Sequence, residues 1–221
     1  MNHIRINHIR INHNIYINHN HNKSYLRYLN TYIYIIKVMA QSHCKGAKIN
    51  KNKNSCEDIM DKDGHVLHTE WTLWYHVPND KKWDKESYKK IIDITTIEDY
   101  WRIHNYLKAA HLENGMYFLM RKNILPMWED SHNKNGGSWS FKIDKKDIYN
   151  MWIELSIAVL GECMMNDEKD SKIINGITTS PKKGFCIVKI WNSDKKQCSK
   201  SLLKDNIQYV DLSHCIYKSH I

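Results

Sequence analysis

Stretches of alternating or β-branched apolar residues predict a series of short β-strands after residue 65. Turn-forming residues or helical patterns separate these stretches from one another. The expected strands cover residues 70–77, 87–93, 115–121, 138–143, 172–179, 185–191 and about 207–212.

Two other stretches follow the 3.6-residue period of an amphipathic helix. In residues 95–110, Thr95 and Glu98 have the spacing of a capping box. In residues 145–162, an apolar stripe ends before a glycine, which commonly follows the last helical turn. A shorter helix is expected at about 199–204.

The order of these elements predicts the fold class. The strands mostly follow one another, and the helices are interspersed without regular βαβ alternation. This order favours an α+β fold, in which helices pack on one face of an antiparallel sheet. The other face would stay free, and a curved face rich in aromatic side chains is a natural ligand site.

The first 64 residues differ in composition from the rest, because all eight tryptophans lie after residue 70. Residues 1–22 are a near-repeat of Asn-His-Ile units, a composition typical of low-complexity disorder. Their histidines lack a defined metal-ligand spacing. We therefore expect a leader at 1–64, with Met39 as an alternative start, and one folded domain at 65–221.

Charge and cysteine content restrict the function classes. The net charge of +9 divides into +5 in residues 1–38, +1 in 39–64 and only +3 in 65–221. A mildly basic domain argues against an extensive grip on long nucleic acid, but leaves room for a few cations around a small anionic group. Six scattered cysteines without CxxC spacing indicate reduced thiols rather than disulfides or a metal site.

Neither a membrane anchor nor an enzyme is indicated. The apolar stretch 25–40 is interrupted by charged residues and is shorter than the roughly 18–20 residues that span a bilayer. A secretory signal pattern is also missing. The sequence contains no phosphate-binding loop, nucleophile elbow or zinc-protease motif. We therefore expect no enzymatic activity, cofactor, metal or membrane association.

Three tryptophans have polar or charged neighbours where loops or strand ends are expected: Trp83, Trp128 and Trp191. Two parallel indoles can enclose a flat aromatic ligand, and a cationic ring gains about 0.5–2 kcal/mol per indole face. A carboxylate beside them, such as Glu129, can accept two hydrogen bonds from the N1–H and N2–H₂ edge of guanine. Taken singly, a tryptophan is more often core, and this is our interpretation of Trp71, Trp74, Trp139 and Trp152.

The chain from His65 to about His214 resembles the eukaryotic translation initiation factor 4E family of cap-binding proteins. The motifs are HVLHTEWTLWY, KKW, TTIEDYWRIHNYL, ILPMWEDSHNKNGGSW, MWIELSIAVLGE and IVKIW, in this order. The resemblance implies a curved antiparallel sheet of about eight strands with helices on its convex face. The concave face would bind the 7-methylguanosine cap of messenger RNA.

The resemblance also implies roles for single residues. By position, Trp83 and Trp128 would stack on the methylated guanine, and Trp191 would contact its methyl group. Glu129 would accept the N1 and N2 hydrogens, and the backbone N–H of Trp128 would reach O6. Ser138 stands where the family usually has an arginine.

The phosphate contacts of the family transfer less directly. Its arginine and lysine in the penultimate pair of strands align with Lys182 and Ile187. Lys183 is adjacent, and strand alternation places Lys189 on the same face as Trp191. We expect Lys182, Lys183 and Lys189 to share the triphosphate, with a weaker dependence on phosphate than in typical relatives.

The convex surface of the family binds scaffold and repressor proteins through a short helical motif. Val66 replaces a usual proline there, and Ser156 replaces a usual leucine. The matching positions are His65, Val66, Ile97, Trp101, Ile153, Glu154, Ile157 and Gly161.

Two functions are compatible with these residues. The protein would bind capped messenger RNA and recruit a scaffold initiation factor, or it would sequester or compete for capped messages without recruitment. A weaker alternative is a general single-strand binder, which predicts no preference for the methylated base. We expect a cytoplasmic monomer, in the host cytoplasm if the source is viral.

Overall fold

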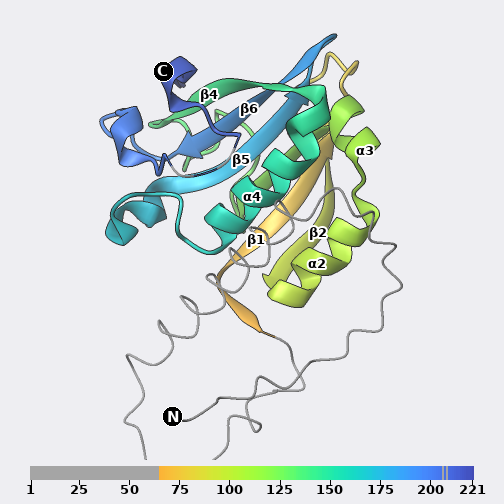
Figure 1. Ribbon diagram of the computed structural model, residues 1–221, viewed down its shortest axis with the longest axis horizontal. Coiled ribbons are helices and arrows are strands. Elements are labelled where there is room, and N and C mark those ends of the chain that lie inside the picture. Colours follow the sequence, from red (N-terminus) through yellow and green to blue (C-terminus); the bar gives the residue numbers. More distant parts are fainter. Residues whose placement is uncertain (1–64, 206, 208) are drawn as a thin grey trace, which may run out of the picture.

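The computed structural model describes residues 65–205, 207 and 209–221 (Figure 1). The expected leader at 1–64 and the alternative start at Met39 lie outside the described residues. The expected domain at 65–221 corresponds to the part that forms the sheet and helices described below.

The centre of the fold is one antiparallel sheet with the strand order β2-β1-β3-β5-β6-β4-β7. The described residues contain seven strands, compared with about eight implied by the family resemblance. The strands are β1 (Val66–His76), β2 (Tyr88–Thr96), β3 (Met116–Arg121), β4 (Gly137–Asp144), β5 (Ile174–Pro181), β6 (Phe185–Asn192) and β7 (Ile216–Ser219).

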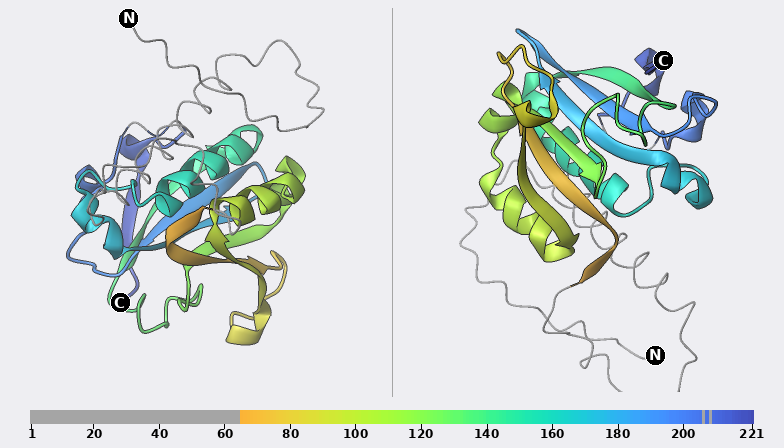
Figure 2. Two further views of the ribbon diagram at one scale, coloured as in Figure 1. Left: turned by 90° about the horizontal axis from the view of Figure 1, so that it is seen from below. Right: turned by 180° about the vertical axis from the view of Figure 1, so that it is seen from behind.

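Three α-helices lie along one face of this sheet, as the left view of Figure 2 shows. The α+β fold, with helices on one side of a curved antiparallel sheet, is therefore confirmed. The helices are α2 (Ile97–Tyr106), α3 (Ala109–Asn114) and α4 (Ile148–Leu160). Short 3-10 turns complete the chain: η2 (Lys85–Ser87), η3 (Lys145–Asp147), η4 (Glu168–Ile173), η5 (Lys200–Leu202) and η6 (Leu212–His214).

The capping box of α2 lies one residue later than expected. Thr96 accepts a hydrogen bond from the Asp99 backbone N–H at 3.1 Å, and Asp99 accepts one from the Thr96 N–H at 3.0 Å. The shift arises because β2 continues to Thr96. The Ile97 N–H that follows still donates to the His65 carbonyl oxygen, next to the start of β1. Glu98 is consequently available to bind the His65 ring and backbone nitrogens, at 2.7 and 2.8 Å.

The last strand also differs from its predicted position. We expected it at about 207–212, but β7 begins at Ile216. Tyr209 has a φ of 71°, which interrupts extended backbone, and Asp211 caps the turn η6 by accepting a hydrogen bond from the Ser213 N–H. The strand that pairs with β4 therefore forms only after this turn.

The two faces of the sheet bury different clusters. Trp71 and Trp139 are fully buried and Trp152 is 3% exposed, all in the main core between sheet and helices. Trp74 is half-buried and packs against a second, smaller core cluster. Because side chains alternate along β1, Trp74 points away from Leu73, which lies in the main core. The second cluster comprises Tyr88, Met116, Phe118, Met120, Ile124 and Trp191.

A partly buried ion pair connects the end of β3 with the turn after α4. The Arg121 guanidinium bonds both carboxylate oxygens of Glu162 at 2.5 Å, and their side chains are only 13% and 16% exposed. Arg121 also donates to the Ile174 carbonyl oxygen at 2.6 Å and lies 4.7 Å above the Trp71 ring. These contacts join three strands and a helix at the point where the chain leaves β3.

Candidate functional site

The face of the sheet away from the helices carries the two loops that contain the expected ligand-stacking residues. The left view of Figure 2 shows both the β1–β2 connection and the Trp128 loop (residues 122–136) on this side. Trp83 and Trp128 are 49% and 57% exposed, which agrees with their polar sequence neighbours. Trp191 lies on β6 and is 7% exposed, with its ring N–H donating to Thr178 at 2.8 Å.

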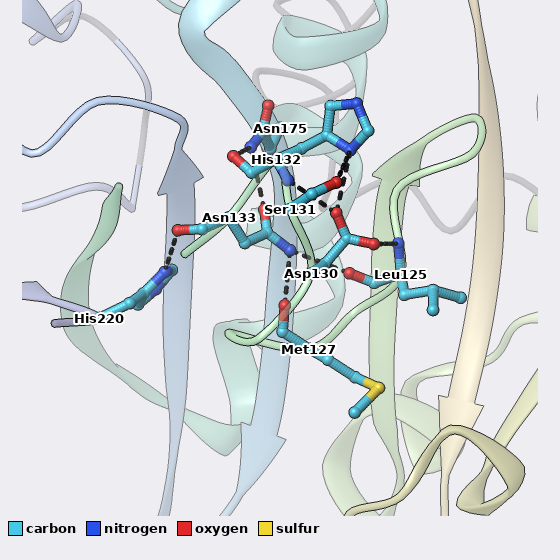
Figure 3. Close-up of polar contacts among 8 residues, drawn as sticks. All are labelled: Leu125, Met127, Asp130, Ser131, His132, Asn133, Asn175 and His220. Carbon is cyan, nitrogen blue, oxygen red and sulfur yellow. Dashed lines mark hydrogen bonds and ion pairs between the residues drawn. The ribbon is translucent and has the colours of Figure 1, made fainter. Parts of the chain in front are cut away.

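A single buried side chain determines the shape of the Trp128 loop (Figure 3). Asn133 is fully buried, and its amide donates to the carbonyl oxygens of Leu125 and Met127 at 2.9 and 2.7 Å. Its own side-chain oxygen accepts from Asn175 on β5 at 2.9 Å. The backbone on the N-terminal side of Trp128 is thereby tied to the sheet.

The C-terminal end of the chain supports the same loop. His220 bonds the Asn133 carbonyl oxygen at 2.7 Å, and its ring centre lies 4.9 Å from that of Trp191. Since a carbonyl only accepts, Nδ1 of His220 carries the hydrogen. Gly136 lets the returning chain pass, because a Cβ there would lie 1.8 Å from the Asn192 carbonyl oxygen.

Asp130 closes the loop behind Trp128 and Glu129. It accepts hydrogen bonds from the backbone N–H groups of Leu125 and His132, at 3.1 and 2.9 Å. Burial opposes ionisation, but these hydrogen bonds outweigh it and lower the pKa of Asp130 below its ordinary value. Asp130 is therefore a structural acid, whereas the neighbouring Glu129 is exposed.

The charge of Glu129 acts on groups of the sheet face beneath it. Burial, and then the Glu129 carboxylate, raise the pKa of Tyr88 to about 12. Burial lowers the pKa of His220, whereas the Asn133 hydrogen bond and the Glu129 charge oppose that shift. Tyr88 also lies 6.3 Å from Trp83, measured between ring centres. Tyr88 is thus influenced by Glu129 of one loop and lies near Trp83 of the other.

Comparison with known proteins identifies the family of this chain. The family model for eukaryotic initiation factor 4E matches residues 66–220. The chain belongs to the eukaryotic initiation factor 4E family. Eukaryotic translation initiation factor 4E of Candida albicans is 33% identical over 150 residues, 63% of this chain and 68% of that protein. The Saccharomyces cerevisiae protein is 35% identical over 138 residues, 59% and 63% of the two chains.

Solved structures of the factor 4E family are similar to this fold as well. Ascaris suum eIF4E-3 in complex with m7G cap has a TM-score of 0.54 at 29% identity, covering 61% of this chain and 76% of that one. Caenorhabditis elegans eIF4E-3 in complex with the 4E-binding protein Mextli has a TM-score of 0.54 at 26% identity, covering 60% and 78%.

The basic residues near the candidate site include one that the sequence analysis does not name. Lys218 on β7 is the cross-strand partner of Ser138, the position where the family usually has arginine. Trp191 pairs with Ser138 from the other side, so the three side chains share a face. Strand alternation within residues 216–219 would place Lys218 on this face, but the sequence predicts the last strand at about 207–212.

The expected lysines are only partly brought together. Lys189 pairs with Ser140, one row from Lys218, and it is half-buried. Burial lowers the pKa of Lys189, and the charges of Lys218 and Lys182 lower it further. Lys183 is exposed in the turn between β5 and β6 and is not among the charges that shift this pKa.

The expected partner-binding positions lie around the start of β1, α2 and α4. Val66 is 60% exposed, whereas Ile153 and Ile157 are only 4% and 7% exposed. His65 is exposed, and Ile97, Trp101, Glu154 and Gly161 are half-buried. Ser156 does not line this surface, because it is fully buried and hydrogen-bonded to the Tyr100 hydroxyl at 2.7 Å.

Within residues 65–221, leaving aside 206 and 208, no group of three or more His, Cys, Asp and Glu side chains could hold a metal ion. In the same part of the chain, no helix is long and apolar enough to cross a membrane.

Replacing Asn133 should loosen the Trp128 loop. Asn133→Ala removes the hydrogen bonds to the Leu125 and Met127 carbonyls and from the Asn175 amide, each worth about 0.5–1.5 kcal/mol. The three groups keep one other bond each, with the Met127 N–H, the Asp130 N–H and the His132 carbonyl. We expect a lower free energy of unfolding in denaturant and faster amide hydrogen exchange across the loop. The control is Asn135→Ala at an exposed position of the same loop, which should change stability by less than about 0.5 kcal/mol. Equal effects of the two variants on stability and exchange would mean that Asn133 does not hold the Trp128 loop.

Proposed function

We propose that this protein binds the 7-methylguanosine cap of messenger RNA between Trp83 and Trp128. The observation that carries the proposal is the pair of half-exposed indoles on two loops over the same sheet face, with the Glu129 charge directed at that face. Membership in the initiation factor 4E family and the similarity to Ascaris suum eIF4E-3 with m7G cap support it.

The chemistry of the ligand explains these residue types. Methylation at N7 makes the guanine ring cationic, and an indole on each face contributes about 0.5–2 kcal/mol of cation–π attraction. Glu129 accepts hydrogen bonds from N1–H and N2–H₂, a paired donor edge that distinguishes guanine from the other bases. The Trp128 backbone N–H reaches O6, and Trp191 at the floor contacts the methyl group.

We infer that lysines, rather than an arginine on β4, bind the triphosphate. The charges of Lys182 and Lys218 lower the pKa of Lys189, and Lys218 is paired with Ser138 across the strands. A lysine presents a mobile point charge instead of a planar fork with two donors. We therefore infer a phosphate contact that is less directional than an arginine contact, with Lys183 in a peripheral role.

In the cell, we propose a cytoplasmic role in translation initiation, in which the convex surface recruits a scaffold factor. The complex of Caenorhabditis elegans eIF4E-3 with Mextli supports a protein-binding role of the fold. The alternative is sequestration of capped messages without recruitment. It is favoured by the burial of Ile153 and Ile157, which leaves less apolar surface for a partner.

The preference for the methylated base is the central test. In titrations with 7-methyl-GTP and GTP, we expect at least about tenfold tighter binding of 7-methyl-GTP, because only the methylated ring is cationic. Glu129→Gln should weaken binding of 7-methyl-GTP about tenfold or more, since it removes charge-assisted hydrogen bonds. Glu86→Gln, an exposed acid in η2, is the control and should bind like the wild type. Equal affinity of the wild type for the two nucleotides would exclude the proposal.

The lysine assignment is tested by shortening the phosphate chain. We expect Lys218→Met and Lys189→Met to reduce the affinity ratio between 7-methyl-GTP and 7-methyl-GMP, with less effect on 7-methyl-GMP itself. The ratio should also fall with rising salt in the wild type, because exposed charges are screened. Lys146→Met, on the helix side of the molecule, should leave the ratio unchanged. If Lys218→Met leaves the affinity ratio unchanged, Lys218 does not contact the phosphates.

Recruitment requires that the convex surface binds a scaffold protein, whereas sequestration does not. If the protein recruits a scaffold, an amphipathic helical peptide from such a factor should bind, and Val66→Asp should weaken that binding without changing the 7-methyl-GTP affinity. Ile91→Asp, an exposed apolar position on β2, is the control. If the wild type binds 7-methyl-GTP but no such peptide, sequestration is the correct description.

A further inference from the structure

The inner face of Trp83 is covered by a histidine. His76, the last residue of β1, is fully buried and stacks on the Trp83 ring with a centroid distance of 4.1 Å and an interplanar angle of 3°. The Trp83 side chain nevertheless remains 49% exposed. One face of the indole is thus occupied by the protein itself.

The same imidazole also holds the backbone next to Trp83. The Nε2 atom of His76 lies 2.8 Å from the Lys82 carbonyl oxygen. Since that oxygen only accepts, Nε2 is the donor, and Nδ1 has no hydrogen-bond partner in the described part of the chain. Both the ring plane of Trp83 and the chain that leads into it are therefore set by one side chain.

Further rings continue this arrangement into the sheet. The Tyr88 ring on β2 lies 5.1 Å from His76 at 58°, and Phe118 on β3 lies 5.4 Å from Tyr88 at 77°. Such tilted and edge contacts are favourable geometries for aromatic pairs. Trp83 is the outermost ring of an aromatic column (Trp83, His76, Tyr88, Phe118) that begins on the central strands.

Trp128 has a different kind of support. The ring contacts of the described residues do not include Trp128, which is 57% exposed and depends on the backbone bonds of its loop. The two stacking residues are thus unequal, because the Trp83 ring is oriented before a ligand arrives. A side chain that is already ordered loses less conformational freedom on binding.

We propose that His76 is a positioning residue that sets ligand affinity by orienting Trp83. The inference rests on the proposed function, since it assumes that a flat cationic base stacks on the outer face of Trp83. His76 combines a flat ring, which stacks, with an N–H donor, which fixes the Lys82 carbonyl. Stacking of the two rings orients the plane of the Trp83 indole, whereas the hydrogen bond holds only the backbone beside it.

Two variants separate the stack from simple filling of space. His76→Leu keeps the bulk but removes the flat ring and the hydrogen bond, and we expect about tenfold weaker binding of 7-methyl-GTP by calorimetry. His76→Phe restores a flat ring and should recover affinity to within about threefold of the wild type. The control is His68→Ala at an exposed position of the same strand, which should have no effect. Thermal unfolding of each variant reports whether it is folded.

A double-mutant cycle shows whether His76 acts through Trp83. In a Trp83→Ala background, His76→Leu should have no further effect on affinity. The same loss in both backgrounds would mean a general structural role and would overturn the proposal, as would a folded His76→Phe variant that binds tenfold more weakly. A wild type without preference for 7-methyl-GTP would instead refute the proposed function. If that wild type still binds guanine nucleotides, the cycle with GTP continues to test His76.

Discussion

The ion pair of Arg121 and Glu162 joins the centre of the sheet to the end of α4 and constrains both. The two side chains are only 13% and 16% exposed, so little solvent would compensate the charge that is left when one partner is removed. Glu162 adopts a φ of 54° just after α4, and Arg121 is the last residue of β3 before the Trp128 loop. The pair therefore ties the turn after α4 to the strand end from which this loop leaves the sheet.

Strand alternation gives the two faces of the sheet different surroundings. One face buries the main core under the helices, and the other carries a small apolar cluster beneath exposed loops. Loops are mobile by default, so a binding site built on them needs local support. Asn133 supplies it for the Trp128 loop through backbone carbonyls, and His76 supplies it for Trp83 through ring stacking. Two segments that are distant in the sequence are thereby held over the same sheet face.

Strand pairing places a basic side chain beside a position where the family usually has arginine. Ser138 lacks the positive charge that the family usually places on β4, but its cross-strand neighbour Lys218 carries one on β7. Directly opposite residues have Cβ atoms about 4.5–5.5 Å apart, so Lys218 lies beside the Ser138 position on the same sheet face. Residues far apart along the chain can consequently exchange roles, provided that strand pairing brings them together.

The sequence by itself determined the alternating strands, the two main helical stretches and the tryptophans that remain exposed, because periodicity and polar neighbours are local properties. It predicted Trp83, Trp128 and Glu129 as site residues, and these lie over one sheet face in the structure. Only the tertiary structure decided which strand pairs with β4, and with it the places of Lys218 and His220. Register and stacking depend on contacts between distant segments, for which a single sequence carries no periodic signal.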